Sequence, residues 1–275
     1  MIFGAFEGWA IFDVIAYLIL GVIQGLTEFL PVSSSGHLAL FSDLMGEQQD
    51  DLTFSILAHF ATALSTIVVF RKEIIELAVG FFKPSESGGL QARKYILLLA
   101  LSAIPAATIG FTMKDQIEGL ISTPFVGAML LVTAAILALS QKLNSRTDNA
   151  LAPKNSILIG LAQAVAILPG ISRSGSTIGA ALLLGISRAE AAKFSFLMAL
   201  PVILGATLLE TKDLLENGSG ISSYDVSYWG YFVGFFAAFI TGIFACKLMI
   251  RLVKGTNLMW FAVYCGVIGL IAIIA

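Results

Sequence analysis

The stretch "GLTEFLPVSSSGH", residues 25–37, places a carboxylate, three consecutive serines and a histidine in a long apolar run that begins at Trp9. Ionisable groups are expensive in a lipid bilayer, so such residues within an apolar segment usually serve a function. Pro31 stops a helix, and irregular backbone at membrane depth is tolerated only where it is buried in protein or lines a wet cavity. The stretch therefore predicts a broken helix whose tip faces a polar cavity.

The composition of the whole chain agrees with a membrane location. Hydrophobic residues make up 57% and charged residues 12% of the 275 residues, against about 25% charged in soluble domains. One soluble core of this size cannot hide so much apolar surface. We predict an all-α polytopic protein that forms a single integral membrane domain over residues 1–275. The net charge of −2 gives no electrostatic support for nucleic-acid binding.

Six apolar segments approach the length of about 20 residues that a helix needs to cross a bilayer. They are Phe54–Phe70, Tyr95–Met113, Phe125–Leu139, Phe194–Leu209, Trp229–Leu248 and Leu258–Ala275. Two further pairs of apolar segments are interrupted by polar residues, and most of their arms are too short to span alone. We predict that each pair is a re-entrant helix hairpin, formed by Ile11–Leu30 with His37–Met45 and by Ile157–Leu168 with Thr177–Gly185.

Basic residues lie mainly in the segments that this arrangement places on one side. If the span ending near Arg71 ends in the cytoplasm, 13 of the 16 basic residues are cytoplasmic: Arg71, Lys72, Lys83, Arg93, Lys94, Lys142, Arg146, Lys154, Arg188, Lys193, Lys247, Arg251 and Lys254. The positive-inside rule expects this asymmetry. It requires that the first hairpin open outward and the second toward the cytoplasm. Both termini and the opening of the site are then predicted to lie outside.

The two broken segments resemble each other at a constant offset of 139 residues. "GVIQG…VSSSG" begins at Gly21 and "GLAQA…ISRSG" at Gly160. Further along, "FSILA" at position 54 matches "FSFLM" at position 194, at an offset of 140. We predict two inverted-topology repeats, residues 1–141 and 155–275, each a re-entrant hairpin plus three transmembrane helices. Because three is an odd number of spans, the second half must cross the membrane in the opposite direction to the first. Small residues four apart, such as Gly21 and Gly25, are expected to let helices pack closely.

The first break carries groups that can act as base, metal ligand or nucleophile. These candidates are Gln24, Glu28, Ser33, Ser34, Ser35 and His37. Gln24 and Glu28 share one helical face because they are four apart. At least one serine is expected to cap the helix that follows. Beside Glu28 and the serines, His37 is predicted to be catalytic, whereas His59, alone in an apolar span, is expected to be a hydrogen-bonded core histidine.

The second break, "PGISRSGST" from Pro169 to Thr177, has the composition of an anion site. Arg173 at membrane depth needs an anionic partner, either Glu28 or a ligand. The flanking hydroxyls that would join it are Ser172, Ser174, Ser176 and Thr177. The helix that starts near Gly175 directs free N–H groups at the tip. A diphosphate carries more negative charge than Arg173 and a protonated His37 can offset. We therefore expect Mg²⁺ or Ca²⁺ bridged by Glu28 and phosphate oxygens.

The segments Gln24–His37 and Pro169–Thr177 resemble the two signature motifs of the undecaprenyl-diphosphate phosphatase family, also called bacitracin-resistance proteins. In length, motif spacing and pattern of spans, the resemblance covers essentially the whole chain. Gln24 stands where that family usually has a first acidic residue, which weakens any mechanism needing two carboxylates. The resemblance implies a fold of interlocked inverted repeats. It also implies functional residues at Glu28, Ser34, His37, Ser172, Arg173, Ser174 and Thr177, with Gln24 in support.

The activity implied by this resemblance is removal of the terminal phosphate from a C55 polyprenyl diphosphate, which recycles the lipid carrier for cell-wall synthesis. Arg173 and the hydroxyls of the second motif would clamp the phosphates. The nucleophile stays open among His37, Ser34 activated by His37, and a water activated by Glu28. A polyprenyl-phosphate flippase with the same clamp is the alternative function. The expected partners are the lipid substrate and the cell membrane, with a homodimer left open.

Overall fold

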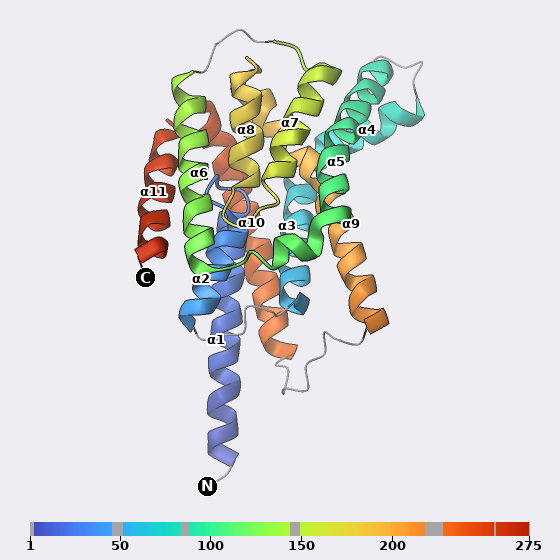
Figure 1. Ribbon diagram of the computed structural model, residues 1–275. Helices are drawn as coiled ribbons and strands as arrows, with labels where there is room; N and C mark the ends of the chain where they lie inside the picture. The colour runs from blue at the N-terminus through green and yellow to red at the C-terminus, as the bar shows by residue number, and fades with distance from the viewer. Residues whose placement is uncertain are drawn as a thin grey trace.

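The computed structural model describes residues 3–45, 52–83, 88–143, 149–217, 228–255 and 257–274, and over these ranges all regular structure is helical (Figure 1). The helices are α1 Phe3–Thr27, α2 Ser34–Met45, α3 Leu52–Val69, α4 Arg71–Phe82, α5 Gly89–Glu118, α6 Thr123–Lys142, α7 Pro153–Val165, α8 Arg173–Leu183, α9 Arg188–Asn217, α10 Tyr228–Gly255 and α11 Met259–Ile274. The all-α prediction is confirmed for this part of the chain. Arg146, one of the basic residues that set the predicted orientation, lies outside the described ranges, and the Lys114 side chain is likewise not described.

Four of these helices are long and apolar enough to cross a membrane, and they lie at Gly89–Met113, Thr123–Lys142, Arg188–Leu214 and Tyr228–Gly255. A fifth span is available if α3 and α4 are taken together across their bend. Large apolar side chains such as Phe232 and Phe244 remain exposed, as expected where lipid rather than water covers a helix. The chain is therefore a polytopic membrane protein.

Two of the observed helices differ from what the sequence predicts. The span predicted at Leu258–Ala275 falls on α11, whose 16 residues extend only about 24 Å at 1.5 Å per residue. The helix α4 was not predicted; it turns by 76° from α3 at Phe70. None of its side chains is buried, and with 12 residues it is shorter than the apolar runs on which the prediction relied.

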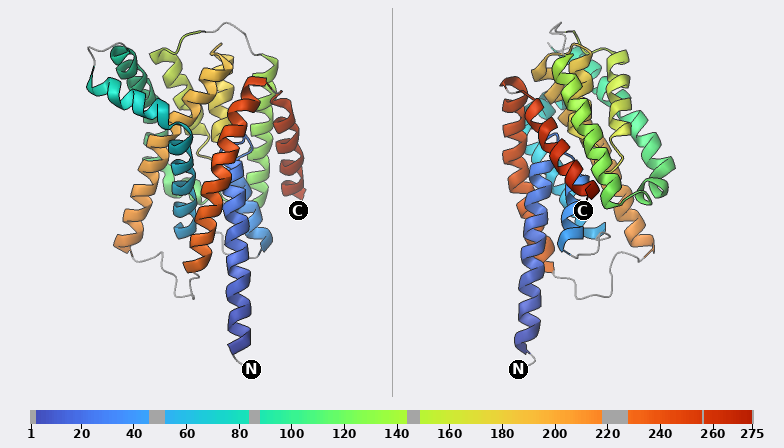
Figure 2. Two further views of the ribbon diagram at one scale, coloured as in Figure 1. Left: turned by 180° about the vertical axis from the view of Figure 1, so that it is seen from behind. Right: turned by 60° about the vertical axis from the view of Figure 1, so that its left-hand side comes forward.

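Both predicted hairpins are present, each as two helices joined by a short break. The pair α1 and α2 enters the bundle from the end at which the N-terminus lies, and α7 and α8 enter from the opposite end (Figures 1 and 2). The arms α2, α7 and α8 have 12, 13 and 11 residues, too short to span alone. The arm α1 differs from the prediction, because it begins at Phe3 and has 25 residues.

Small residues allow each hairpin to pack closely on a long helix from the other half of the chain. A β-carbon placed on Gly21 of α1 would lie 2.2 Å from the carbonyl oxygen of Gly234 in α10. One placed on Gly160 of α7 would lie 2.5 Å from the carbonyl oxygen of Ser102 in α5. The predicted close helix packing at these glycines is confirmed, and it fixes the height of both tips within the bundle.

Candidate active site

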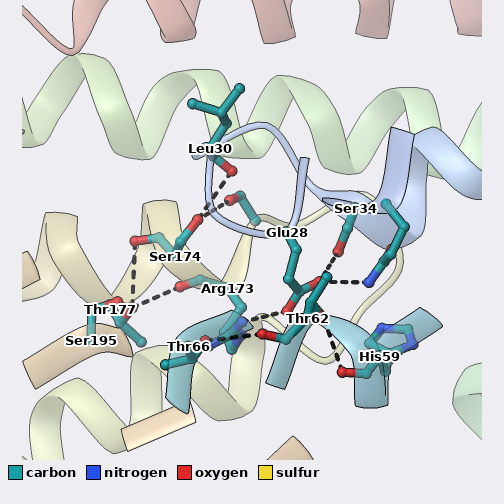
Figure 3. A network of polar contacts seen from close by, with 12 residues as sticks. Glu28, Leu30, Ser34, His59, Thr62, Thr66, Arg173, Ser174, Thr177 and Ser195 are labelled. Carbon is teal, nitrogen blue, oxygen red and sulfur yellow. Dashed lines mark hydrogen bonds and ion pairs between the residues drawn. The ribbon is translucent and has the colours of Figure 1, made fainter. Parts of the chain in front are cut away.

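The Glu28 carboxylate is the point at which the two hairpin tips meet. Glu28 follows the end of α1 and is almost completely buried. Its Oε2 accepts hydrogen bonds from Ser34 Oγ at 2.6 Å and from Gln24 Nε2 at 3.1 Å. Its Oε1 forms an ion pair with Nη2 of Arg173 from the second hairpin (Figure 3). A single carboxylate therefore positions a hydroxyl on one side and a guanidinium on the other.

Arg173 is placed by the start of α8. Ser172 caps this helix, because its Oγ accepts a hydrogen bond from the N–H of Gly175 at 3.1 Å. Within the described part of the chain, Nη1 of Arg173 is buried and has no hydrogen-bond partner. A buried guanidinium nitrogen without a partner is costly. The guanidinium is thus paired with Glu28 through one nitrogen and can bind an anion through the other.

The serines of the first break have separate tasks. Ser33 has a positive φ of 71°, and its Oγ accepts from the N–H of Gly36 at 3.2 Å. It is therefore the capping serine that the sequence predicted. Ser35 Oγ lies 3.4 Å from Ser33 Oγ. Ser34 is the serine whose hydroxyl contacts the buried carboxylate.

Hydroxyls of the second motif mainly hold the two tips in place. Ser174 Oγ donates to the carbonyl of Leu30 at 3.1 Å, which ties α8 to the first break. Thr177 Oγ1 donates to the Arg173 carbonyl at 2.8 Å and lies 2.6 Å from Ser195 Oγ in α9. Ser176 Oγ is buried without a partner among the described residues. These three side chains do not line the cavity described next.

A cavity of about 190 Å³ opens beside the Glu28–Arg173 pair. Its walls come from both breaks and from α3 and α9, and its lining residues are Thr27, Glu28, Ser34, Ser35, His59, Ile171, Ser172, Arg173, Val202, Ile203, Ala206, Thr207 and Glu210. The first turns of α2 and α8 both reach this cavity. Helix N-termini favour anions, so two such ends and a guanidinium make the cavity suited to a phosphate group. Gln24 and Ser33 support the wall without lining it.

The structure places His37 away from this cavity. Its Nδ1 lies 2.8 Å from the Ser33 carbonyl and its Nε2 lies 2.8 Å from the Tyr264 hydroxyl. The ring stacks on Tyr264 of α11, with ring centroids 5.6 Å apart. Both nitrogens are therefore occupied, and this geometry gives His37 no direct access to a ligand in the cavity. The catalytic role predicted for His37 stays a prediction without geometric support.

The sequence reasoning passed over two residues that line the cavity, His59 on α3 and Glu210 on α9. His59 was expected to be a core histidine, because nothing next to it in the sequence is polar enough to suggest a site. Glu210 lies near the end of a long apolar helix. Only the three-dimensional arrangement brings both side chains to the cavity that Glu28 lines, so no local signal could have found them.

The donor set for a metal ion is limited. Within the part of the chain that the structure describes, no three His, Cys, Asp or Glu side chains are grouped to hold a metal ion. Among the described residues, Glu28 Oε1 pairs with Arg173, and a carboxylate oxygen has a second lone pair that a cation shared with a ligand could use. The expected divalent cation, bridged by Glu28 and phosphate oxygens, stays a prediction.

The fold and site together define a polytopic membrane protein with a polar cavity between the tips of two helical hairpins. The family described as bacitracin resistance protein BacA matches residues 17–271, and the chain belongs to this family. It is 45% identical over 267 residues to the undecaprenyl-diphosphatase of Christiangramia forsetii, covering 95% of this chain and 98% of that protein.

Two further relatives carry the same name. The undecaprenyl-diphosphatase of Parabacteroides distasonis is 46% identical, over 93% of this chain and 96% of the relative. That of Methanosphaera stadtmanae is 38% identical, over 95% of this chain and 98% of the relative.

Proposed function

We propose that this protein is a membrane-embedded phosphatase that hydrolyses undecaprenyl diphosphate to the monophosphate and inorganic phosphate. Such an activity recycles the lipid carrier for cell-wall synthesis and confers bacitracin resistance. Family membership and the shared name of its relatives support this function. The observation that carries the mechanism is the hydrogen bond from Ser34 Oγ to Glu28 Oε2, with Arg173 on the other oxygen.

In the proposed first step, Ser34 Oγ attacks the terminal phosphorus and its proton passes to Glu28. A general base must lie within hydrogen-bonding reach of the proton that it takes, and the 2.6 Å contact satisfies this requirement. The bond from phosphorus to the bridging oxygen breaks, and the prenyl monophosphate leaves with the electron pair. Arg173 and the first turn of α8 stabilise the charge on the phosphate oxygens, which is the main contribution in phosphoryl transfer.

The remaining polar groups are proposed to orient the phosphates or to hold the groups that do. Ser35 and Ser172 line the cavity and would contact the substrate directly. Four others would act through the contacts described above; they are Gln24, Ser33, Ser174 and Thr177. Ser176, whose buried hydroxyl has no partner among the described residues, would contact the phosphate only if the substrate reaches it. Apolar side chains of α9, among them Val202 and Ile203, form the wall along which the prenyl chain would leave the cavity.

A divalent cation, Mg²⁺ or Ca²⁺, is also proposed. It would be held by diphosphate oxygens and the remaining lone pair of Glu28 Oε1, and when bound it would offset phosphate charge. A phosphatase assay with and without a chelator tests this requirement. Restoration of the rate by added Mg²⁺ or Ca²⁺ would support it, and an unchanged rate after chelation would contradict it.

The inverted repeat is proposed for the whole chain, with residues 1–141 and 155–275 as its halves. It is supported by the opposite entry of the two hairpins (Figure 1) and by equivalent packing, since α1 packs on α10 as α7 packs on α5. An outward opening of the cavity, outward termini and a homodimer are separate proposals. Crosslinking in native membranes tests the homodimer.

The experiment that tests the function measures inorganic phosphate released from a polyprenyl diphosphate by the purified protein in detergent. We expect the native protein to release phosphate, and Ser34→Ala to reduce the rate at least about 100-fold, because general-base and nucleophilic groups contribute on that scale. Phe60→Leu, at a partly exposed position of α3 outside the cavity lining, is the control. Movement of lipid between leaflets without phosphate release would indicate the flippase instead.

A further inference from the structure

His59 is the histidine that lines the cavity, and it takes no part in the first step of the proposed mechanism. It lies on α3, on the same cavity as Glu28, Ser34 and Arg173 (Figure 3). The first step leaves a phosphorylated Ser34 and a protonated Glu28. Hydrolysis of that intermediate requires a second group to take a proton from water, and Glu28 is already protonated.

The hydrogen bonding of His59 determines which of its nitrogens can act. Nδ1 lies 2.9 Å from the carbonyl oxygen of Ser55. A carbonyl only accepts, so Nδ1 carries the hydrogen and Nε2 carries the lone pair in the neutral ring. Within the described part of the chain, Nε2 has no hydrogen-bond partner among protein groups. By contrast, Nε2 of His37 is occupied by Tyr264.

We propose that His59 is the general base of the second step, an inference that rests on the proposed function. Water attacks the phosphorus of phosphorylated Ser34, and its proton passes to Nε2 of His59. The bond from phosphorus to Ser34 Oγ breaks, and Oγ takes back the proton held by Glu28. Inorganic phosphate leaves, and His59 releases its proton to solvent. One water is consumed and one phosphate is released per cycle, so the atoms balance.

The charges around the cavity suit a histidine that becomes cationic for part of the cycle. The ionisable side chains that line it with His59 are Glu28 and Arg173 from the hairpin tips and Glu210 from α9. Arg173 is paired with Glu28, and Glu210 places a second carboxylate on the cavity that His59 lines. The departing phosphate is also anionic, and it is held beside the protonated His59.

The test follows the two products separately in one preparation. The probe is farnesyl diphosphate labelled in its terminal phosphate, supplied to protein in detergent. We expect His59→Gln to release about one equivalent of farnesyl monophosphate per enzyme quickly, while steady phosphate release falls about 100- to 10,000-fold, the range for loss of a general base. The label should accumulate on Ser34. Imidazole added to His59→Ala should restore phosphate release, because it can occupy the vacated space.

Controls separate this inference from the function beneath it. Ser34→Ala should retain no label, and Phe60→Leu should behave as the native protein does. Phosphate release by the native protein together with rapid turnover by His59→Gln, or with no rescue of His59→Ala by imidazole, would overturn the role of His59. Absence of labelled Ser34 in every variant would overturn it too. Failure of the native protein to release phosphate would instead refute the proposed function itself.

Discussion

At the scale of single residues, the Glu28 carboxylate combines two roles that mutation can separate. It is the proposed base for Ser34, and it neutralises Arg173, whose side chain is 17% exposed. Glu28→Gln removes the charge and keeps the shape. We expect phosphate release to fall about 100- to 10,000-fold through loss of the base. We also expect a loss of about 3–5 kcal/mol of stability, because a buried cation is left unpaired.

Thermal unfolding in detergent and a phosphate assay measure the two effects. A second substitution, Arg173→Gln, provides the control, because it removes the unpaired cation. The double variant should regain much of the stability of Glu28→Gln and none of its activity. If Glu28→Gln is as stable as the native protein, the ion pair does not contribute as the buried geometry indicates.

Arg173→Lys tests whether the geometry of the guanidinium matters beyond its charge. Arginine can bind Glu28 through Nη2 and a phosphate through Nη1 at the same time, whereas a lysine ammonium lacks this planar fork. We expect the rate to fall about 100-fold, as on loss of one donor to a transition-state oxyanion. Measurement of kcat and KM checks this, and a rate close to native would show that charge alone suffices.

The contrast between the two histidines shows where residue-level prediction stops. The sequence placed Glu28, Ser34 and Arg173 correctly near one another, because the polar residues flank breaks in apolar helices. The same reasoning favoured His37 for its nearness to the serines, but the start of α2 turns that ring toward Tyr264. His59 is distant in sequence, and the packing of α3 brings it to the cavity.

At the scale of elements, the second tip is held by a residue outside both motifs. Thr133 of α6 donates from Oγ1 to the Gly170 carbonyl and accepts from the Ser172 N–H, both at 3.0 Å. Thr133→Val keeps the shape and leaves two buried backbone groups unpaired, so we expect a loss of about 1–3 kcal/mol. Thermal unfolding measures it, with the exposed Thr108→Val as control. Equal melting temperatures for the two variants would contradict this role.

The hairpins also depend on small residues at their contacts with long helices. Gly21→Ala would bring a methyl group to 2.2 Å from the Gly234 carbonyl oxygen, forcing α1 away from α10 and shifting the Glu28 tip. We expect lower stability, by about 1–3 kcal/mol as for overpacking, together with reduced phosphate release. Gly110→Ala on α5 is the control, since nothing lies within 4 Å there. It should be neutral or slightly stabilising because alanine favours helix.

Elements were predictable where a strong local signal coincided with the tertiary structure. Proline, glycine and serine runs marked both hairpin breaks, and long apolar runs marked α5, α6, α9 and α10. The helix α4 lacked such a signal because it is short and begins with charged residues. The contact of Thr133 with the second tip has no local signal at all, since it joins residues 37 and 39 positions apart.

At the scale of the whole molecule, the unequal distribution of basic residues between the two ends of the bundle predicts its orientation in the membrane. The described basic residues at the ends of α6 and α10 and at the starts of α4, α5, α7 and α9 lie toward the end of the bundle from which α7 and α8 enter (Figure 1). The positive-inside rule assigns that end to the cytoplasm. We therefore predict that the hairpin of α1 and α2, whose tip borders the cavity, enters the membrane from the outside.

Single cysteines at the two ends of α6 test this orientation. Leu120, just before α6, and Leu143, just after it, are both exposed. The native Cys246 and Cys265 are fully buried, so background labelling should be low. In intact spheroplasts, a membrane-impermeant maleimide should label Leu120→Cys at least about tenfold more than Leu143→Cys, because charged reagents do not cross the hydrocarbon core. Permeabilised cells should label both equally. The opposite preference would place the basic end outside and turn the cavity toward the cytoplasm, whereas equal labelling in intact spheroplasts would indicate both orientations in the membrane.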